Sequence, residues 1–173
     1  MPFKFSTLAA LAGTVLALSV LPSMAQESYP DRPVTLVVPF PPGGTLDTAA
    51  RIIANELEGT LGQPVIIDNR SGAGGNIGAD FVAKSEPDGY TLLMGALSTH
   101  GINVSLYQDM PFDPVADFAP ISLVATTPNV LVVGERIEAS SPMALAELAR
   151  ATEGGLTYAS GSSGSAGHLA GEL

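Results

Sequence analysis

The order of apolar runs and glycine-rich loops constrains the fold of this chain more than any other feature of its sequence. Residues 32–40, "RPVTLVVPF", form a continuous valine-rich run, which is typical of a strand buried on both faces. The loop "PPGG" follows, and apolar residues then recur at helical spacing as far as Leu61, with Thr45 as the expected N-cap. The sequence therefore predicts a strand, a glycine turn and a helix in direct succession.

The same succession repeats downstream. Residues 63–68, "QPVIID", predict a second strand, and the stretch "DNRSGAGGNIGAD" leads into a short predicted helix at residues 77–84. The turn "PDGY" precedes a third apolar run at residues 91–97, which predicts another strand. Because strands that alternate with helices pair in parallel through right-handed crossovers, we expect an α/β fold built on a parallel sheet.

The second half of the chain follows a different pattern. Two β-rich runs at residues 121–125 and 130–133 succeed one another with no helix between them, which suggests that the chain passes from one lobe into another. A serine-proline pair at Ser141 predicts the start of a helix, and residues 154–160 predict a further strand. A last loop leads into a short predicted helix near Ala166.

These patterns predict the domain organisation. Because no strand follows the last helix, the second lobe is expected to be incomplete, and we interpret the chain as C-terminally truncated. Residues 1–25 are expected to form a signal peptide, residues 26–126 the first segment of lobe 1, and residues 127–173 the start of lobe 2.

The first residues carry the pattern of a secretory signal peptide. Lys4 precedes an apolar core at residues 8–20, and Ser23 and Ala25 supply the small residues that signal peptidase requires. The core is shorter than a membrane-spanning helix, so we expect cleavage near Ala25; a membrane anchor is the alternative. The chain has no cysteine, so neither a disulfide framework nor a thiolate metal site is expected.

The charge of the chain bears on its partners. A formal net charge of −10 weighs against nucleic acid and anionic lipid surfaces. A small anionic ligand stays compatible with this charge, because exposed charges are screened beyond about 8 Å at physiological salt whereas a cluster of amide dipoles acts at contact.

The glycine-rich loop at residues 71–76, "SGAGGN", matches no nucleotide-binding fingerprint. Ile77 takes the place of the third small residue of a dinucleotide loop, and the glycines are not followed by the Lys-Ser/Thr pair of a P-loop. The loop is therefore expected to act through its backbone, since glycines with positive φ let N–H groups converge on an anion at a helix start. A plain tight turn is the alternative.

Two other loops occupy equivalent places after predicted strands. They are "PPGGTLD" at residues 41–47 and "ASGSSGSAGH" at residues 159–168. Ligands of open parallel sheets bind at the loops that follow the carboxyl ends of the strands. The three loops together favour a binding site over a set of unrelated turns.

Catalytic and metal-binding alternatives are weaker. The serine cluster suggests an esterase, but Ser165 stands where the G-x-S-x-G motif needs glycine, and the sequence given holds no histidine after His168 for the usual hydrolase order. His100 and His168 lack the spacing of metal ligands, so capping or packing is expected for both. Asp47, at a helix start, either stabilises the helix dipole or accepts a hydrogen bond from a ligand.

Four segments of the sequence resemble, in order, the Bug receptors, which are the periplasmic substrate-binding proteins of tripartite tricarboxylate transporters. They are "YPDRPVTLVVPFPPGGTLDTAAR", "VIIDNRSGAGGNIGAD", "DGYTLLMGALSTHGINVSLY" and "LTYASGSSGSAGHLAGEL". The resemblance implies a type II periplasmic binding protein fold, in which two α/β lobes close on a small carboxylate. It also implies a monomeric periplasmic receptor, without cofactor, metal or enzymatic activity, that delivers its solute to membrane permease subunits.

The resemblance further implies ligand-binding positions in four segments. They are Gly43, Gly44, Thr45 and Asp47 in the first loop, Gly72, Ala73, Gly74, Gly75 and Asn76 in the second, Ser98, Thr99 and His100 on the cleft floor, and Ser160, Gly164, Ser165 and His168 from the second lobe. The implied mechanism is binding without chemistry, followed by hinge closure. We expect weaker binding than in a full-length receptor. A sensor that presents the same solute to a signalling partner is the alternative.

Overall fold

The computed structural model describes residues 29–161 and 163–172. The expected signal peptide lies outside the described residues. The chain divides into two compact units, Met1–Asp31 and Arg32–Leu173, and every helix and strand below belongs to the second unit.

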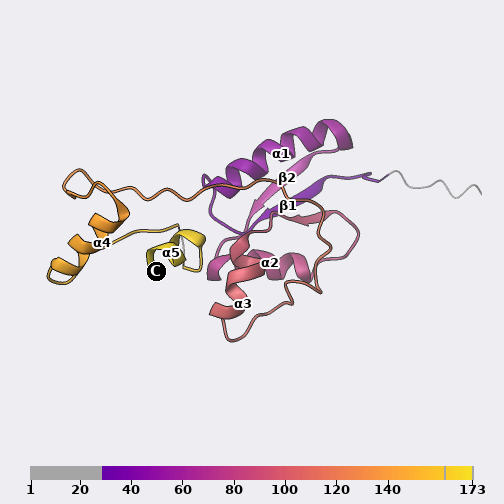
Figure 1. Ribbon diagram of the computed structural model, residues 1–173. Coiled ribbons are helices and arrows are strands. Elements are labelled where there is room, and N and C mark those ends of the chain that lie inside the picture. The colour runs from indigo at the N-terminus through magenta and orange to yellow at the C-terminus, as the bar shows by residue number, and fades with distance from the viewer. Residues whose placement is uncertain (1–28, 162, 173) are drawn as a thin grey trace, which may run out of the picture. The chain divides into compact units, whose positions relative to one another are not determined.

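A three-stranded parallel sheet forms the centre of this unit (Figure 1). Its strands are β1 (Val34–Val38), β2 (Val65–Asn69) and β3 (Thr91–Leu93), in the order β2-β1-β3. The valine-rich run forms the middle strand, and Val34, Val37 and Val38 are completely buried. The parallel sheet expected from the sequence is therefore confirmed, although β3 ends earlier than the predicted run at residues 91–97.

Helices cover both faces of the sheet (Figure 1). Helix α1 (Thr45–Leu61) packs against β1 and β2, and α2 (Asn76–Ala83) packs against β1 and β3. Side chains of β1 alternate between the two faces, so Leu36 and Val38 join Ala50 and Ala54 of α1 in the main core. The result is a helix–sheet–helix layering that places the loops after β1 and β2 at the same edge of the sheet.

The expected N-cap of α1 is wrong by one residue. Gly44 occupies the N-cap position, and Thr45 is the first residue of the helix. No side chain caps the helix, and the carboxylate of Asp47, in the first turn, instead accepts from the N–H of Gly43 at 2.8 Å, just before the N-cap. At the other end, Gly62 adopts the left-handed conformation that commonly ends a helix.

The remaining elements are short. They are η1 (Ala73–Gly75), the π-helix η2 (Ser98–Ile102), α3 (Asn103–Leu106), α4 (Pro142–Ala151) and α5 (Ala166–Glu172). The Ser141 hydroxyl accepts a hydrogen bond from the N–H of Ala144 at 3.2 Å, so the predicted start of α4 is confirmed. Helix α5 also begins where the sequence predicts it. Within the described residues, no helix is both long enough and apolar enough to cross a membrane.

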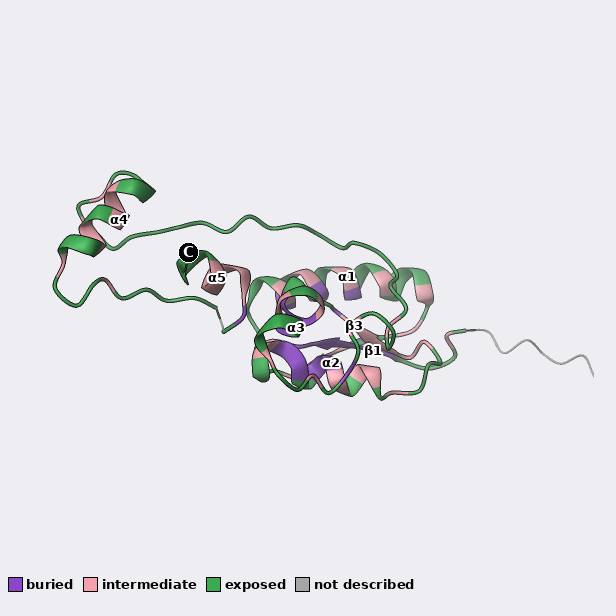
Figure 2. Ribbon diagram, turned by 60° about the horizontal axis from the view of Figure 1, so that its bottom comes forward, coloured by how far each residue is buried: buried purple, intermediate pink, exposed green. Residues whose placement is uncertain are grey.

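The strands expected at residues 121–125, 130–133 and 154–160 are wrong, since the structure assigns none of these residues to a strand. Figure 2 shows the segment between α3 and α4 as mostly exposed, and Ile121 and Leu123 are each 81% exposed. A strand needs a neighbour to satisfy its backbone N–H and C=O groups, and the described part of the chain supplies no neighbour for these runs.

Candidate functional site

The loop after β2 presents unpaired backbone donors. Four successive residues have positive φ: Gly72 (134°), Ala73 (48°), Gly74 (65°) and Gly75 (96°). The N–H of Gly75 donates to the carbonyl of Gly72, whereas the N–H groups of Gly72, Ala73 and Gly74 have no partner among the hydrogen bonds of the described residues. Turns with successive positive φ values can form concave clusters of N–H groups that bind anions, and the expected binding by this backbone stays a prediction.

Buried side chains hold this loop from behind. A Cβ on Gly75 would lie 2.7 Å from Thr99 Cγ2, so only glycine fits at this position. The side chain of Asn103, which is completely buried, donates to the carbonyl of Gly74 at 3.0 Å and to Asn76 Oδ1 at 2.6 Å. The conformation of the loop is therefore set by residues that follow it in the sequence by more than twenty positions.

The loop after β1 is fixed by Asp47. This residue is only 2% exposed, and its carboxylate accepts hydrogen bonds from the N–H of Gly43 and from the side chains of Arg51 and Asn69. These hydrogen bonds, led by that of Arg51, hold the pKa of Asp47 well below its usual range. Asp47 is therefore ionised at neutral pH, and both of its oxygens already accept hydrogen bonds from the protein.

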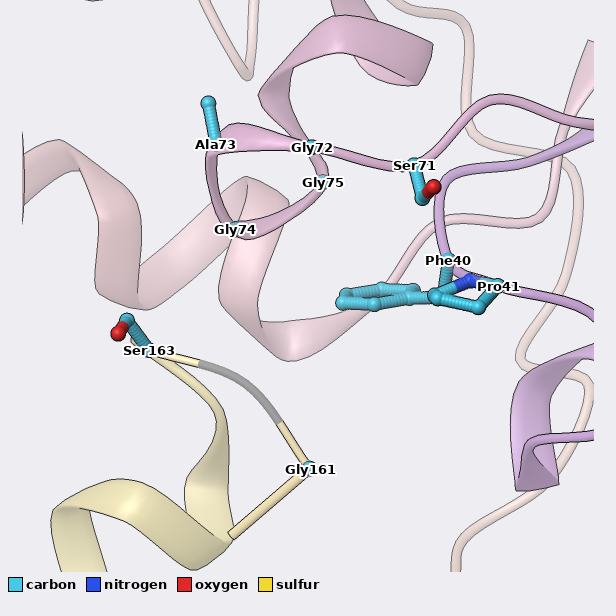
Figure 3. Close-up of a pocket in the computed structure, with 9 residues that line it drawn as sticks. All are labelled: Phe40, Pro41, Ser71, Gly72, Ala73, Gly74, Gly75, Gly161 and Ser163. Carbon is cyan, nitrogen blue, oxygen red and sulfur yellow. The ribbon is translucent and has the colours of Figure 1, made fainter.

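The two loops border a pocket of about 390 Å³ (Figure 3). Phe40 and Pro41 lie on one side and the glycine loop lies across from them, while Gly161 and Ser163 approach from a third side. The lining residues are Phe40, Pro41, Ser71, Gly72, Ala73, Gly74, Gly75, Gly161 and Ser163. None of them carries a charge, so the pocket combines backbone donors with an apolar wall.

The structure brings some of the expected site residues to the pocket and places others around it. Gly72, Ala73, Gly74 and Gly75 line it, whereas Asn76 is buried behind the loop. Gly43, Gly44 and Thr45 are exposed, near Pro41 in the chain but outside the pocket lining.

The segment expected on the cleft floor lies behind the glycine loop. Ser98 and Thr99 are buried, and the Thr99 hydroxyl donates to the carbonyl of Ala96 at 3.0 Å. Burial lowers the pKa of His100, whose ring lies edge-on to that of Phe118 with 4.8 Å between ring centroids. None of the three lines the pocket, and Thr99 is the one whose side chain lies against a glycine of the loop, Gly75.

The positions expected from the second lobe flank Gly161 and Ser163 in sequence. Gly164 is buried beside Asn103, and the Ser165 hydroxyl accepts from the N–H of His168 at 3.1 Å, which caps α5. The imidazole Nδ1 of His168 accepts from the N–H of Gly164 at 3.4 Å, and within the described residues it makes no hydrogen bond with a serine hydroxyl. Ser160 is exposed and outside the pocket lining.

Sequence reasoning missed five lining residues: Phe40, Pro41, Ser71, Gly161 and Ser163. All five belong to the three loops that the sequence analysis singled out, or directly border them. The apolar Phe40 and Pro41 come two and three residues after the end of the buried strand β1, and this position in the sequence is the signal that could have identified them.

The chain is similar to several known proteins. The model of the family described as "Tripartite tricarboxylate transporter family receptor" matches residues 49–173. Protein BugT of Bordetella pertussis is 40% identical over 172 residues, which are 98% of this chain and 53% of BugT. The chain thus spans about half the length of the curated relatives it matches.

Two solved structures are also similar. The structure of R. palustris Rpa4515 with adipate is 46% identical, has a TM-score of 0.68, and is matched over 71% of this chain and 41% of that chain. The structure of MatC (Rpa3494) from Rhodopseudomonas palustris with bound malate is 49% identical, has a TM-score of 0.54, and is matched over 56% of this chain and 33% of that chain.

Proposed function

Since the chain belongs to the tripartite tricarboxylate transporter family of receptors, we propose that it is the solute-binding part of an extracytoplasmic receptor for a small carboxylate. The receptor delivers this solute to the membrane permease of a tripartite tricarboxylate transporter. The observation that carries the proposal is the set of unpaired N–H groups of Gly72, Ala73 and Gly74, within the described residues, at the edge of an uncharged pocket.

The energetics of this arrangement suit a carboxylate. A hydrogen bond to a charged group contributes about 1.5–3 kcal/mol, so three to five such bonds could supply the roughly 8 kcal/mol of a micromolar site after ordering costs. The pocket lining, as far as the structure describes it, holds no cationic side chain, so the negative charge of the solute is balanced by amide dipoles. This explains how an acidic chain, of net charge −10, can bind an anion.

The relatives support the class of solute. Rpa4515 is described with adipate and MatC with bound malate, and both ligands are small dicarboxylates. For this chain we propose the class only, with one carboxylate at the glycine loop and the body of the solute along Phe40 and Pro41. Export to the periplasm through the signal peptide, action as a monomer, closure of two lobes around the solute and the absence of enzymatic activity are parts of the same proposal.

An amide-resolved titration tests the proposal. Adipate and malate are added to the ¹⁵N-labelled chain, and adipamide serves as a neutral control of the same length as adipate. We expect at least one of the two acids to shift the N–H resonances of Gly72, Ala73 and Gly74, because a carboxylate there forms new hydrogen bonds. Adipamide should leave them unchanged. Equal shifts with adipamide, or no shift with any of the three, would contradict a carboxylate site at this loop.

Two further measurements separate the alternatives. Turnover of a generic ester that is lost in Ser163→Ala would favour a hydrolase. Capture of a membrane signalling protein in place of permease subunits, in a pull-down with solute present, would favour a sensor.

A further inference from the structure

Three polar side chains connect the two pocket loops: Asp47 and Arg51 of α1, and Asn69 at the end of β2. The Oδ2 atom of Asp47 accepts from the N–H of Gly43 at 2.8 Å and from Arg51 Nε at 2.9 Å. Its Oδ1 atom accepts from Arg51 Nη2 at 3.0 Å and from Asn69 Nδ2 at 2.9 Å. Asp47 therefore accepts four hydrogen bonds while it is almost completely buried.

Asn69 extends this cluster across the edge of the sheet. Its Nδ2 atom also donates to the carbonyl of Phe40 at 3.1 Å, and its Oδ1 atom accepts from Arg51 Nη2 at 3.3 Å. Phe40 belongs to the loop after β1 and lines the pocket, whereas Asn69 directly precedes the loop that carries the unpaired N–H groups. The side chain of Asn69 thus bonds to the backbone of the loop after β1, while its main chain continues into the loop after β2.

We propose that Asp47, Arg51 and Asn69 are positioning residues, which hold the two pocket loops at a fixed separation so that the N–H groups of the second loop face Phe40 and Pro41. The inference rests on the proposed function for its significance, but its geometry does not depend on any ligand. It gives Asp47 a different role from the expected ligand contact, and it adds Arg51 and Asn69, which sequence reasoning did not identify.

The burial and chemistry of the cluster support a positioning role. A buried carboxylate is costly unless it is paired and hydrogen-bonded, and here the guanidinium supplies two nearly parallel donors that restrict its orientation. The side chain of Arg51 is 54% exposed while that of Asp47 is 3% exposed. The arginine therefore covers the carboxylate from the solvent side, and Asn69 completes its coordination from the sheet side.

The competing explanation is that Asp47 and Arg51 only stabilise α1. Both effects on helices are well known, since a carboxylate in the first turn favours the helix dipole and acid–base pairs four residues apart stabilise helices. This explanation predicts that removing the cluster disturbs α1 alone. The positioning role predicts that a substitution of Asn69 also changes the loop after β1, and that a substitution of Asp47 also changes the loop after β2.

The chain contains a matched control. Asp80 and Lys84 form another ion pair four residues apart, in and just after α2, with 2.7 Å between Nζ and Oδ1. Within the described residues, the hydrogen bonds of this pair's side chains stay between the two partners and do not reach either pocket loop. Asp80→Asn should therefore disturb its own helix and leave both loops unchanged.

The test uses backbone amide spectra and hydrogen exchange of the whole chain without ligand. Asn69→Ala should speed the exchange of the Gly43 N–H several-fold and shift the N–H resonance of Phe40. Asp47→Asn should shift the N–H resonances of Gly72 and Ala73. Two substitutions of Arg51 are compared. Arg51→Lys keeps the positive charge but loses the paired donors, so it should shift the N–H resonances of the two loops less than Arg51→Ala does.

Changes confined to α1 in all of these variants would overturn the proposal. If Asp47→Asn does not fold, Asn69→Ala still decides the question, because Asn69 lies outside the helix. Titration with adipate and malate then separates this inference from the proposed function. If the variants shift the loop resonances but the unchanged chain binds neither acid, the proposed function is rejected and the positioning role is kept. If the unchanged chain binds an acid and Asn69→Ala binds it equally well, the function is kept and the positioning role is rejected.

Discussion

Asn103 Nδ2 donates a hydrogen bond to the carbonyl oxygen of Gly74, with 3.0 Å between the two atoms, from a side chain that is completely buried. The same nitrogen donates to Asn76 Oδ1, so one amide group fixes both the glycine loop and the start of α2. The geometry of the candidate binding loop is therefore controlled by α3, which does not itself line the pocket.

Removal of this amide should destabilise the protein. Asn103→Leu leaves the Gly74 carbonyl and the Asn76 side chain without their donor, and buried unsatisfied groups cost about 1–3 kcal/mol each. We expect the free energy of unfolding, measured by urea titration, to fall by about 2–4 kcal/mol. Ser105→Ala, on an exposed position of the same helix, is the control and should change it by less than about 0.5 kcal/mol. Equal effects of the two variants would refute the structural role of Asn103.

A methyl group at Gly75 should destabilise the protein, whereas a methyl group at Gly59 should not. Gly75 has φ of 96°, and its Cβ would lie 2.7 Å from Thr99 Cγ2. Gly75→Ala is therefore expected to lower the free energy of unfolding by about 1–3 kcal/mol. Gly59 lies in α1, and a methyl group there would meet no neighbouring atom within 4 Å, so Gly59→Ala should raise the same quantity by about 0.5–1 kcal/mol. Thermal or urea unfolding of both variants provides the comparison.

The stability contribution of Asp47 should depend on pH in a defined direction. Its pKa is lowered in the folded state, so the ionised carboxylate contributes stability above the unfolded-state value of about 3.9. That contribution is lost as the pH falls below this value toward the lower folded-state pKa. We expect the difference in unfolding free energy between the unchanged chain and Asp47→Asn to be constant from about pH 7 to pH 5 and to shrink below about pH 4. A difference that already shrinks near neutral pH would contradict the assigned ionisation.

His100 should titrate below the ordinary histidine range. Burial is the main cause that lowers its pKa, and Phe118 covers its ring. Because the unfolded state then binds the proton more readily, this group favours unfolding as the pH falls below about 6.5. Phe118→Ala should expose the ring and return the pKa toward its ordinary value, as followed by the imidazole proton resonances. An unchanged titration in this variant would show that burial by Phe118 is not the cause.

The sequence predicted the elements whose signals are local. The valine-rich run formed β1, the glycine loops followed the strands as expected, and Ser141 capped α4. The predicted strands at residues 121–125, 130–133 and 154–160 were wrong in this structure, because pairing depends on a neighbour and not on composition. The Thr45 cap was wrong as well, because the helix begins one residue earlier than expected and Gly44 takes the N-cap position without a side-chain hydrogen bond.

In the candidate site, too, local features could be predicted from the sequence and contacts between distant residues could not. The three loops were recognisable from their glycines and serines, and the unpaired N–H groups are a direct consequence of the positive φ values that those glycines permit. By contrast, the roles of Asn103, Thr99 and Asn69 depend on side chains that approach from distant parts of the chain. No periodicity or spacing reports such contacts.

The sequence by itself determined the α/β order, the parallel sheet and the loops that border the pocket, because hydrophobic period and glycine content act on neighbouring residues. Only the tertiary structure decided that Asp47 directs its carboxylate to Gly43, Arg51 and Asn69, and that Thr99 supports the glycine loop from behind. The physical reason is that hydrogen-bond partners and burial are set by the packing of the sheet against its helices, which brings together residues that the sequence keeps apart.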